Sequence, residues 1–205
     1  MRIESLKPSE HKKGRFLLTL EDGTLLRITE DEVLRFRLRA GDELDDETRT
    51  EIERSAKRSG TKVKAANMIA SRPLSKGELK KRLVQKGSEA EDAEAAVEWL
   101  EELGAVDDAT YAATLVRHYC SRGYGSARVR EELHRRGVPR ELWDDALSQM
   151  PDSSDTLDAL IQKKTRGDLA DPKERKRVSD ALLRRGFSWS EVRAALGRYT
   201  EIPEE

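Results

Sequence analysis

Three stretches decide the fold: Leu79-Lys-Lys-Arg-Leu83-Val-Gln-Lys-Gly87, Val129-Arg-Glu-Glu-Leu133-His-Arg-Arg-Gly137 and Val178-Ser-Asp-Ala-Leu182-Leu-Arg-Arg-Gly186. In each, apolar residues stand eight and four positions before a glycine, a spacing that places both on one face of a helix. A glycine suits the left-handed turn that ends a helix, and a basic residue always precedes it. The recurrence of this pattern predicts a repeated helical unit.

Each glycine is also followed by a second apolar pattern, six and ten positions later. The pairs are Ala93 with Val97, Trp143 with Leu147, and Val192 with Leu196. A second amphipathic helix therefore folds back after each turn. The glycines are 50 and 49 residues apart, which leaves room for three short helices in each unit. Such thin units gain a core by stacking, so we favour an elongated array with a concave side over a single compact bundle.

The first forty residues have a different character. Arg15–Leu20 and Thr24–Thr29 are rich in strand-forming residues, and the Glu21-Asp22-Gly23 segment between them predicts a hairpin. Met1–Lys7 is a candidate third strand. A short helix from Thr29 or Glu30 is expected to close this sheet with an apolar set comprising Val33, Leu34, Phe36 and Leu38.

Helix signals dominate from Asp46 onward. One helix is expected from Asp46 to about Arg58, ended by Ser59-Gly60, and another from Lys62 to Ser71, where Arg72-Pro73 follows. Ser75 has Glu78 three residues later, the spacing of a capping box at the start of the next helix.

These signals together predict a mostly α-helical protein, an elongated array of three tandem three-helix repeats preceded by a small strand-rich segment. The expected divisions are 1–45 for the strand-rich segment, 46–63 for a connecting helix, 64–106, 107–151 and 152–200 for the repeats, and 201–205 for a tail.

Composition narrows the classes of function. The chain has 205 residues, and its 39 basic and 40 acidic residues nearly cancel, although they are sorted along the sequence. Residues 89–108 carry nine acids and no base, whereas 117–136 carry six arginines against two acids. There is no glycine-rich phosphate loop, and Cys120 and the three histidines match neither a nucleophilic site nor a zinc site. We therefore expect no enzymatic activity, cofactor or metal.

Asp107, Asp108 and Cys120 are better explained by structure and cellular location than by catalysis. Asp107-Asp108 precedes an apolar helical pattern, so we interpret the pair as an N-cap and a first-turn acid in preference to a metal or acid–base site. A single Cys120 fits a reducing compartment, and no apolar run approaches the roughly 18 residues of a membrane span. A soluble, cytoplasmic protein is expected.

Basic clusters are the remaining candidates for function. Cations near a helix C-terminus complement the helix dipole, which explains one or two charges in each helix but not their number here. We therefore weigh equally a purely structural role and a face that meets a polyanion or an acidic protein surface. Tyr119, Tyr124 and Trp189 lie near these bases and are candidates for stacking on exposed nucleobases, although core packing is the commoner role. The candidate binding residues are Arg117, Arg122, Arg128, Arg130, Arg135, Arg136, Lys173, Arg175, Lys176, Arg177, Arg184 and Arg185.

Three ordered motifs resemble a known family. They are Arg72-Pro-Leu-Ser-Lys-Gly-Glu-Leu79, then Leu103-Gly-Ala-Val-Asp-Asp108 with Tyr111-Ala112, then Leu183-Arg-Arg-Gly-Phe-Ser188. Each is weak alone, but the ordered set resembles the RecX family of regulators of the RecA recombinase over about residues 64–199. Val106 stands where that family often has leucine, a conservative apolar change, and the strand-rich segment occurs only in some members.

The resemblance implies three three-helix repeats and a non-enzymatic regulator that modulates RecA in DNA recombination and repair. We also expect a monomer, which suits a protein that binds in a filament groove, and no membrane partner. RecA and its filament on single-stranded DNA would be the partners, and inhibition of strand exchange and ATP hydrolysis the effect. Single- and double-stranded DNA are further candidate partners. Two alternatives stay open: a repeat protein that binds DNA without RecA, and an adaptor that uses the acidic 89–108 surface to capture another protein.

Overall fold

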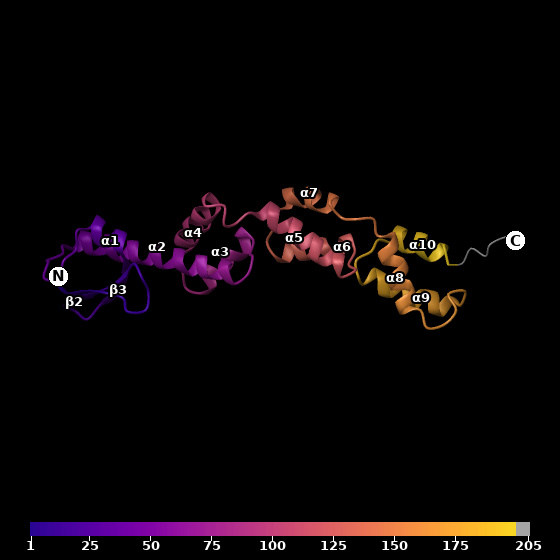
Figure 1. Cartoon of the computed structure of the whole chain (residues 1–205), viewed down its shortest axis with the longest axis horizontal. Coiled ribbons are helices and arrows are strands. Elements are labelled where there is room, and N and C mark those ends of the chain that lie inside the picture. The colour runs from indigo at the N-terminus through magenta and orange to yellow at the C-terminus, as the bar shows by residue number, and fades with distance from the viewer. Residues whose placement is uncertain (200–205) are drawn as a thin grey trace. The chain divides into compact units, whose positions relative to one another are not determined.

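The computed structural model describes residues 1–199 and divides into two compact units (Figure 1). The first contains residues 1–74 and 79–106, and the second contains 75–78 and 107 onward. The expected tail at 201–205, and residue 200 at the end of the third expected repeat, lie outside the described residues. No helix within residues 1–199 has the length and apolar character needed to cross a bilayer.

The first unit opens with the predicted three-stranded sheet. Strands β1 (Ile3–Pro8), β2 (Arg15–Leu20) and β3 (Leu25–Thr29) are antiparallel in the order β1-β2-β3. The expected Asp22-Gly23 turn joins β2 to β3: Gly23 has a φ of 80°, and its N–H donates to the Leu20 carbonyl at 2.9 Å. Leu18, Leu20 and Ile28 are fully buried on the inner face, because alternate residues of a strand point to the same side of the sheet.

Helix α1 (Glu30–Arg35) begins where the sequence predicts, because Thr29 and Glu32 form a reciprocal capping box. Val33 and Phe36 pack against the sheet core, but Leu34 is 69% exposed, so its predicted place in that core is wrong. A six-residue helix presents only one narrow face to the sheet, and Leu34 lies outside it.

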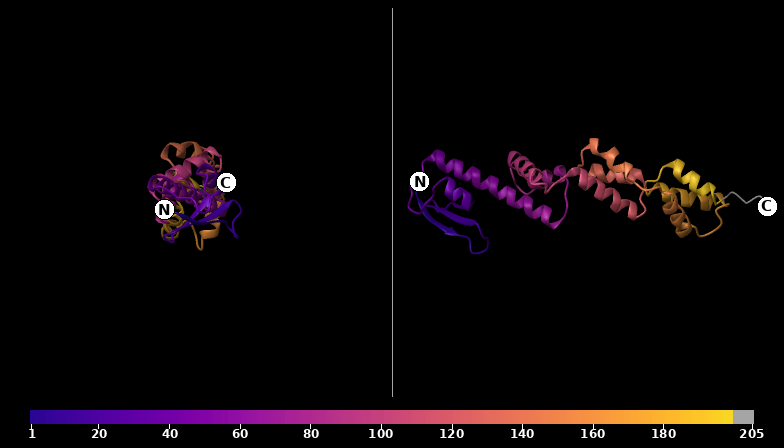
Figure 2. Two further views of the ribbon diagram at one scale, coloured as in Figure 1. Left: turned by 90° about the vertical axis from the view of Figure 1, so that its left-hand side faces the viewer. Right: turned by 45° about the horizontal axis from the view of Figure 1, so that its top comes forward.

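Helix α2 (Asp46–Ser71) is continuous, so the predicted break at Ser59-Gly60 is wrong. A helix-ending glycine needs a positive φ, and Gly60 does not adopt one. The helix continues because Ile52 is buried in the sheet core while Thr61 and Ala65 are buried further along, so both halves have apolar support. Figure 2 shows this long helix running beside the sheet.

The first repeat combines the end of α2 with α3 (Lys76–Gln85) and α4 (Ala90–Glu102). Its core contains the predicted Leu79, Leu83, Ala93 and Val97. The Thr61 hydroxyl donates to Ser88 Oγ at 3.1 Å, which ties α2 to the turn before α4.

The second unit holds the other two repeats. The second repeat consists of α5 (Asp108–Ser121), α6 (Ser126–Arg135), the short 3₁₀ helix η1 (Arg140–Leu142) and α7 (Trp143–Ser148). The third consists of α8 (Ser154–Lys164), α9 (Pro172–Leu183) and α10 (Trp189–Gly197). Asp171 caps α9, whose first residue is Pro172, and a Ser188–Glu191 capping box starts α10.

The three glycine turns confirm the repeat. Gly87, Gly137 and Gly186 have φ values of 81°, 66° and 87°, a region that side-chain-bearing residues rarely adopt. After each turn the next N–H donates to the carbonyl of the matching leucine, Leu83, Leu133 or Leu182. These leucines, with Leu79, Val129 and Val178, are fully buried.

Candidate partner-binding surface of the second unit

The twelve predicted bases all lie in the second unit, on helices α5, α6 and α9 and in the turns that follow them. The structure separates them into two groups. Five form ion pairs or hydrogen bonds with other residues of the unit: Arg128, Arg135, Arg136, Arg177 and Arg185.

Three arginines surround the buried carboxylate of Glu132 on α6. Arg128 Nη2 lies 3.2 Å and Arg136 Nε 3.9 Å from its oxygens, and Arg135 donates to it as well. Burial alone would raise the pKa of Glu132, but the hydrogen bond from Arg135 and the charges of Arg135 and Arg128 outweigh burial and lower the pKa. Glu132 therefore neutralises part of the positive charge that was predicted to bind a partner.

Arg136, the base before the Gly137 turn, contacts the segment Ser75–Glu78. Its Nη1 lies 3.5 Å from Glu78 Oε2 and 3.4 Å from the Tyr111 hydroxyl. The Ser75 hydroxyl donates to the Arg136 carbonyl and accepts from the Glu78 N–H at 3.0 Å. The predicted Ser75 cap is therefore confirmed, and it also connects two segments far apart in sequence.

Arg185, the base before the Gly186 turn, occupies the equivalent position. Its Nη1 donates to the carbonyls of Arg122 and Gly123 at 2.9 and 3.0 Å, and its guanidinium lies 5.2 Å from the centre of the Tyr124 ring. The recurrent base before the glycine thus joins neighbouring segments at both places in this unit.

Glycines also allow close approach at these junctions. A Cβ on Gly77 would lie 2.7 Å from the Gly137 carbonyl oxygen, and one on Gly125 would collide with the backbone of Gly186. The main chains meet so closely that no side chain fits between them. Neither contact could be predicted from the sequence, because only the turn glycines recur at a common position.

Arg177 closes the loop before α9. It pairs with Glu174 and donates to the Lys164 carbonyl at 2.5 Å, while Glu174 accepts from the N–H of Arg166 at 2.7 Å. The hydrogen bond from Arg177, helped by that N–H, lowers the pKa of Glu174 to about 2.

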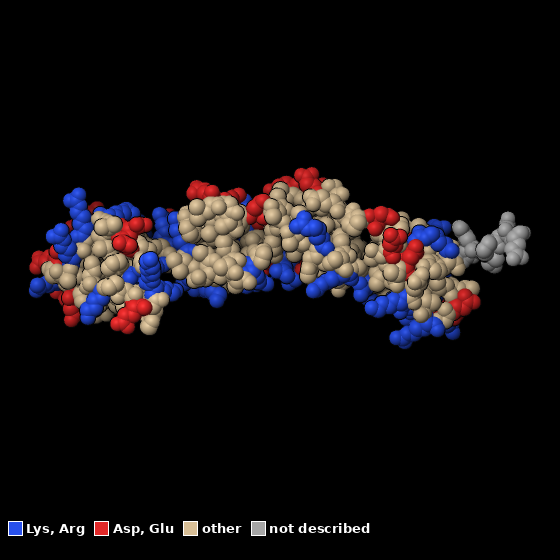
Figure 3. All heavy atoms as spheres, viewed as in Figure 1, with Lys and Arg blue, Asp and Glu red and all other residues tan. Residues whose placement is uncertain are grey.

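The seven other predicted bases form no ion pair with any residue in 1–199. Lys173, Lys176 and Arg184 are exposed at three- and eight-residue spacings, which places them on one side of α9 and its C-terminal turn, with Asp180 among them. Figure 3 shows basic side chains gathered over α9 and acidic ones over α7. The full set is Arg117, Arg122, Arg130, Lys173, Arg175, Lys176 and Arg184.

The three aromatic candidates have different environments. Tyr119 and Tyr124 are partly buried and meet edge to face, with ring centres 5.6 Å apart, so both serve packing. Trp189 is 61% exposed at the start of α10. Of the three rings, Trp189 has a face accessible to a partner.

The acidic pair at 107–108 has the predicted capping role. Asp107 is the N-cap of α5 and accepts from the Ala109 N–H at 2.9 Å. Asp108 is buried in the first turn and accepts from the Lys76 N–H at 2.8 Å. Within residues 1–199, no three His, Cys, Asp or Glu side chains gather as metal ligands do.

These features define a tandem helical-repeat protein whose repeats are joined through glycine turns. A sequence profile described as the second three-helix domain of RecX matches residues 107–147, and one for the third three-helix domain matches residues 152–196. The chain belongs to the RecX family, whose members are regulatory proteins.

Curated relatives cover about two thirds of the chain, and solved structures cover more of it. It is 33% identical over 134 residues to Regulatory protein RecX of Xanthomonas campestris pv. campestris strain B100, spanning 64% of this chain and 83% of that protein. It is 33% identical over 138 residues to the Chromohalobacter salexigens protein of the same name, spanning 67% and 91%. A crystal structure of regulatory protein RecX has a TM-score of 0.76 at 23% identity, covering 95% of this chain and 98% of that one. The RecX structure from Lactobacillus salivarius has a TM-score of 0.65 at 18% identity, covering 71% and 98%.

Proposed function

We propose that this protein binds RecA and its filament on single-stranded DNA, and that it restrains strand exchange and ATP hydrolysis. The observation that carries this proposal is the set of bases that form no ion pair within residues 1–199, chiefly Lys173, Lys176 and Arg184 on and after α9. In a chain with nearly equal numbers of acids and bases, unpaired cations on one side of a helix are available to a polyanionic assembly. Family membership supplies the regulatory role.

The direct test follows ATP hydrolysis by RecA on single-stranded DNA while the purified protein is added. Hydrolysis and strand exchange should fall as the protein binds the filament. If neither activity changes and the protein does not sediment with the filament, the proposed function is wrong.

Variants then test the α9 surface. K173A/K176A/R184A should need about tenfold more protein for the same inhibition, which corresponds to roughly 1.4 kcal/mol of binding free energy. The matched control is K163A/R166A/R193A, which removes three exposed bases of the same unit outside the predicted set. Equal behaviour of the two variants would exclude the α9 surface while leaving RecA regulation open.

Direct DNA binding without RecA is the alternative, favoured by the same exposed bases and by exposed Trp189. It predicts that bare DNA is bound with a log affinity that falls steeply with log salt, and that the α9 variant lowers that slope. Under this alternative, RecA activity changes only where the protein and RecA compete for DNA.

An adaptor role for the acidic 89–108 segment has less structural support. Glu94 pairs with Lys80, and Arg58 lies 3.4 Å from both Glu91 and Asp92. These pairs reduce the negative charge available to a partner. Under the adaptor hypothesis, charge reversal at Glu94 and Glu98 should abolish capture of the other protein while leaving DNA binding intact. Retained capture in that variant would exclude the adaptor role.

A further inference from the structure

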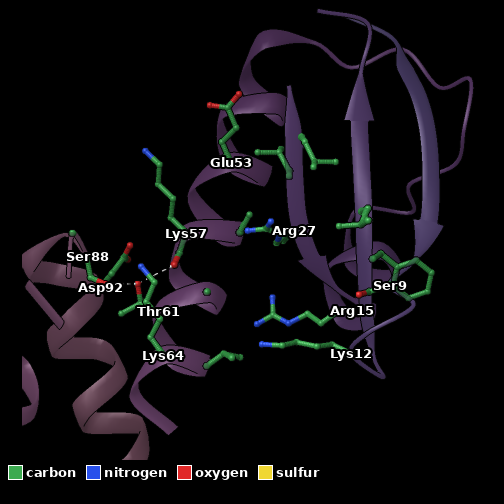
Figure 4. Close-up of a pocket in the computed structure, with 18 of the residues that line it drawn as sticks. Ser9, Lys12, Arg15, Arg27, Glu53, Lys57, Thr61, Lys64, Ser88 and Asp92 are labelled. Atoms are coloured by element: carbon green, nitrogen blue, oxygen red, sulfur yellow. Dashed lines mark hydrogen bonds between the residues drawn. The ribbon is translucent and has the colours of Figure 1, made fainter. Parts of the chain in front are cut away.

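A basic groove lies in the first unit. It has a volume of about 1070 Å³ and is formed by β2, β3, the loop before β2, helix α2 and the turn before α4 (Figure 4). No residue of the predicted set lines it. We define this groove by its basic residues Lys12, Arg15, Arg27, Lys57 and Lys64.

The five bases come from both walls. Lys12, Arg15 and Arg27 belong to the sheet side, and Lys57 and Lys64 belong to α2, two helical turns or about 10.5 Å apart along the axis. Within the described chain, the side chains of Lys12, Arg27, Lys57 and Lys64 form neither an ion pair nor a hydrogen bond. Arg15 donates across the groove to the Ser59 carbonyl at 3.5 Å.

The acidic residues in the lining do not cancel this charge. Glu53 pairs with Arg49 at 2.8 Å, and Asp92 is buried and lies 3.4 Å from Arg58. Glu89 is the remaining lining acid, and it makes no side-chain hydrogen bond as the N-cap of α4. The groove therefore has a clear excess of positive charge.

Gly60 lines the groove in the middle of α2. Glycine is a poor residue for a helix interior, yet a Cβ here would meet no atom within 4 Å. The fold itself therefore does not require glycine at this position. Because Gly60 has no side chain, a ligand bound by the neighbouring basic residues could approach the backbone of α2 closely.

Apolar side chains lie among the bases. Leu17, Leu25 and Val63 belong to the lining, and Leu25 is 51% exposed although it is a large apolar residue. The Thr61–Ser88 hydrogen bond links α2 to the turn before α4 on the far wall. A ligand must therefore offer both negative charge and apolar surface.

We propose that this groove binds single-stranded nucleic acid, with phosphates against the five bases and sugars and nucleobases against the apolar strip. Nonspecific single-strand sites combine a positive groove with aromatic side chains on which bases stack, and the partly buried ring of Phe16 belongs to this lining beside the aliphatic residues. A peptide of acidic residues alone would satisfy the charge but leave the apolar strip exposed. A duplex keeps its bases stacked inside, so it too leaves the strip without a partner.

The test uses the full-length protein and a labelled oligothymidylate, with fluorescence anisotropy measured over a range of salt. K12A/K57A removes one base from each wall, and its matched control K13A/R54A removes the neighbouring bases from the same loop and the same helix. Each phosphate contact contributes about 0.7 to the slope of log affinity against log salt for a single strand. The groove variant should lower that slope by about 1.4, and the control should not.

Gly60→Ala separates binding from stability. Alanine should leave thermal stability equal or higher, because it favours the helix and meets no atom, but its methyl group should weaken oligothymidylate binding. Unchanged binding in both K12A/K57A and G60A would overturn the proposal. Competition by oligoglutamate as strong as that of unlabelled oligothymidylate, or an equal loss of duplex binding in K12A/K57A, would also overturn it. None of these measurements contains RecA, so they are independent of the proposed function.

Discussion

The backbone N–H of Gly125 donates to the carbonyl of Arg185 at 2.9 Å, across sixty residues of sequence. Beside it, the Ala127 N–H donates to the Gly186 carbonyl at 3.0 Å. The start of α6 therefore lies against the glycine turn after α9, with main chain against main chain. Ser75 and Arg136 have the same relationship through the serine hydroxyl.

Gly125→Ala should destabilise the second unit. The added methyl group would collide with the Gly186 turn, so the cost should be about 1–3 kcal/mol, the usual range for overpacking. Urea unfolding followed by circular dichroism measures it. Gly197→Ala is the control, since a Cβ there meets no atom within 4 Å, and an equally large loss in that variant would contradict the junction argument.

Arg184 and Arg185 should behave oppositely although they are adjacent. Arg185→Ala removes two hydrogen bonds to carbonyls and the contact with Tyr124, so the free energy of unfolding should fall by about 1–3 kcal/mol. Arg184→Ala should stay within about 0.5 kcal/mol of wild type, because its side chain is exposed and forms no ion pair within residues 1–199. Thermal unfolding distinguishes the two. A reversed order would show that the two roles have been assigned wrongly.

Ser75→Ala should also destabilise the protein. The serine is fully buried, and its loss leaves the Arg136 carbonyl and the Glu78 N–H without this partner, at a cost of about 1–2 kcal/mol. Ser71→Ala removes an exposed hydroxyl bonded to Met68 and should cost less. Chemical denaturation of both variants checks the difference, and equal losses would argue against a special role for Ser75.

Glu174 should make stability depend on pH in acid. Its pKa is lowered to about 2 in the folded protein, from an ordinary value of 4.5, because Arg177 and loop N–H groups stabilise the carboxylate. The stabilisation is present above pH 4.5 and is lost as the pH falls toward 2. Glu174→Gln should therefore unfold at a lower temperature than wild type near neutral pH, with the gap closing through that range. A gap that stays constant down to pH 2 would contradict this assignment.

Much of the fold could be predicted because periodicity and turn chemistry are local. The glycine turns, the Asp22-Gly23 hairpin and the caps at Ser75 and Asp107 depend on neighbours within a few residues. The predicted helix end at Gly60 was wrong because packing along the whole of α2 outweighs the low helix propensity of a single glycine. Packing against segments that are distant in sequence cannot be predicted from a local sequence pattern.

The candidate site was harder to predict for the same reason. Charge alone could not show that Arg136 and Arg185 join segments while Arg184 is exposed, since the distinction depends on carbonyls and rings distant in sequence. The basic groove was missed because its bases are scattered from Lys12 to Lys64 and converge only when the sheet lies beside α2.

The glycine that packs against a turn stands at a different position of the repeat in the Gly77–Gly137 contact and in the Gly125–Gly186 contact. One junction has Ser75 and Gly77, and the other has Gly125 and Ala127 at the matching positions. Each glycine turn therefore fits only the segment that has its glycine at the position the turn approaches. Chimaeras that exchange these two segments should therefore misassemble, because each turn would meet a side chain where it now meets a glycine.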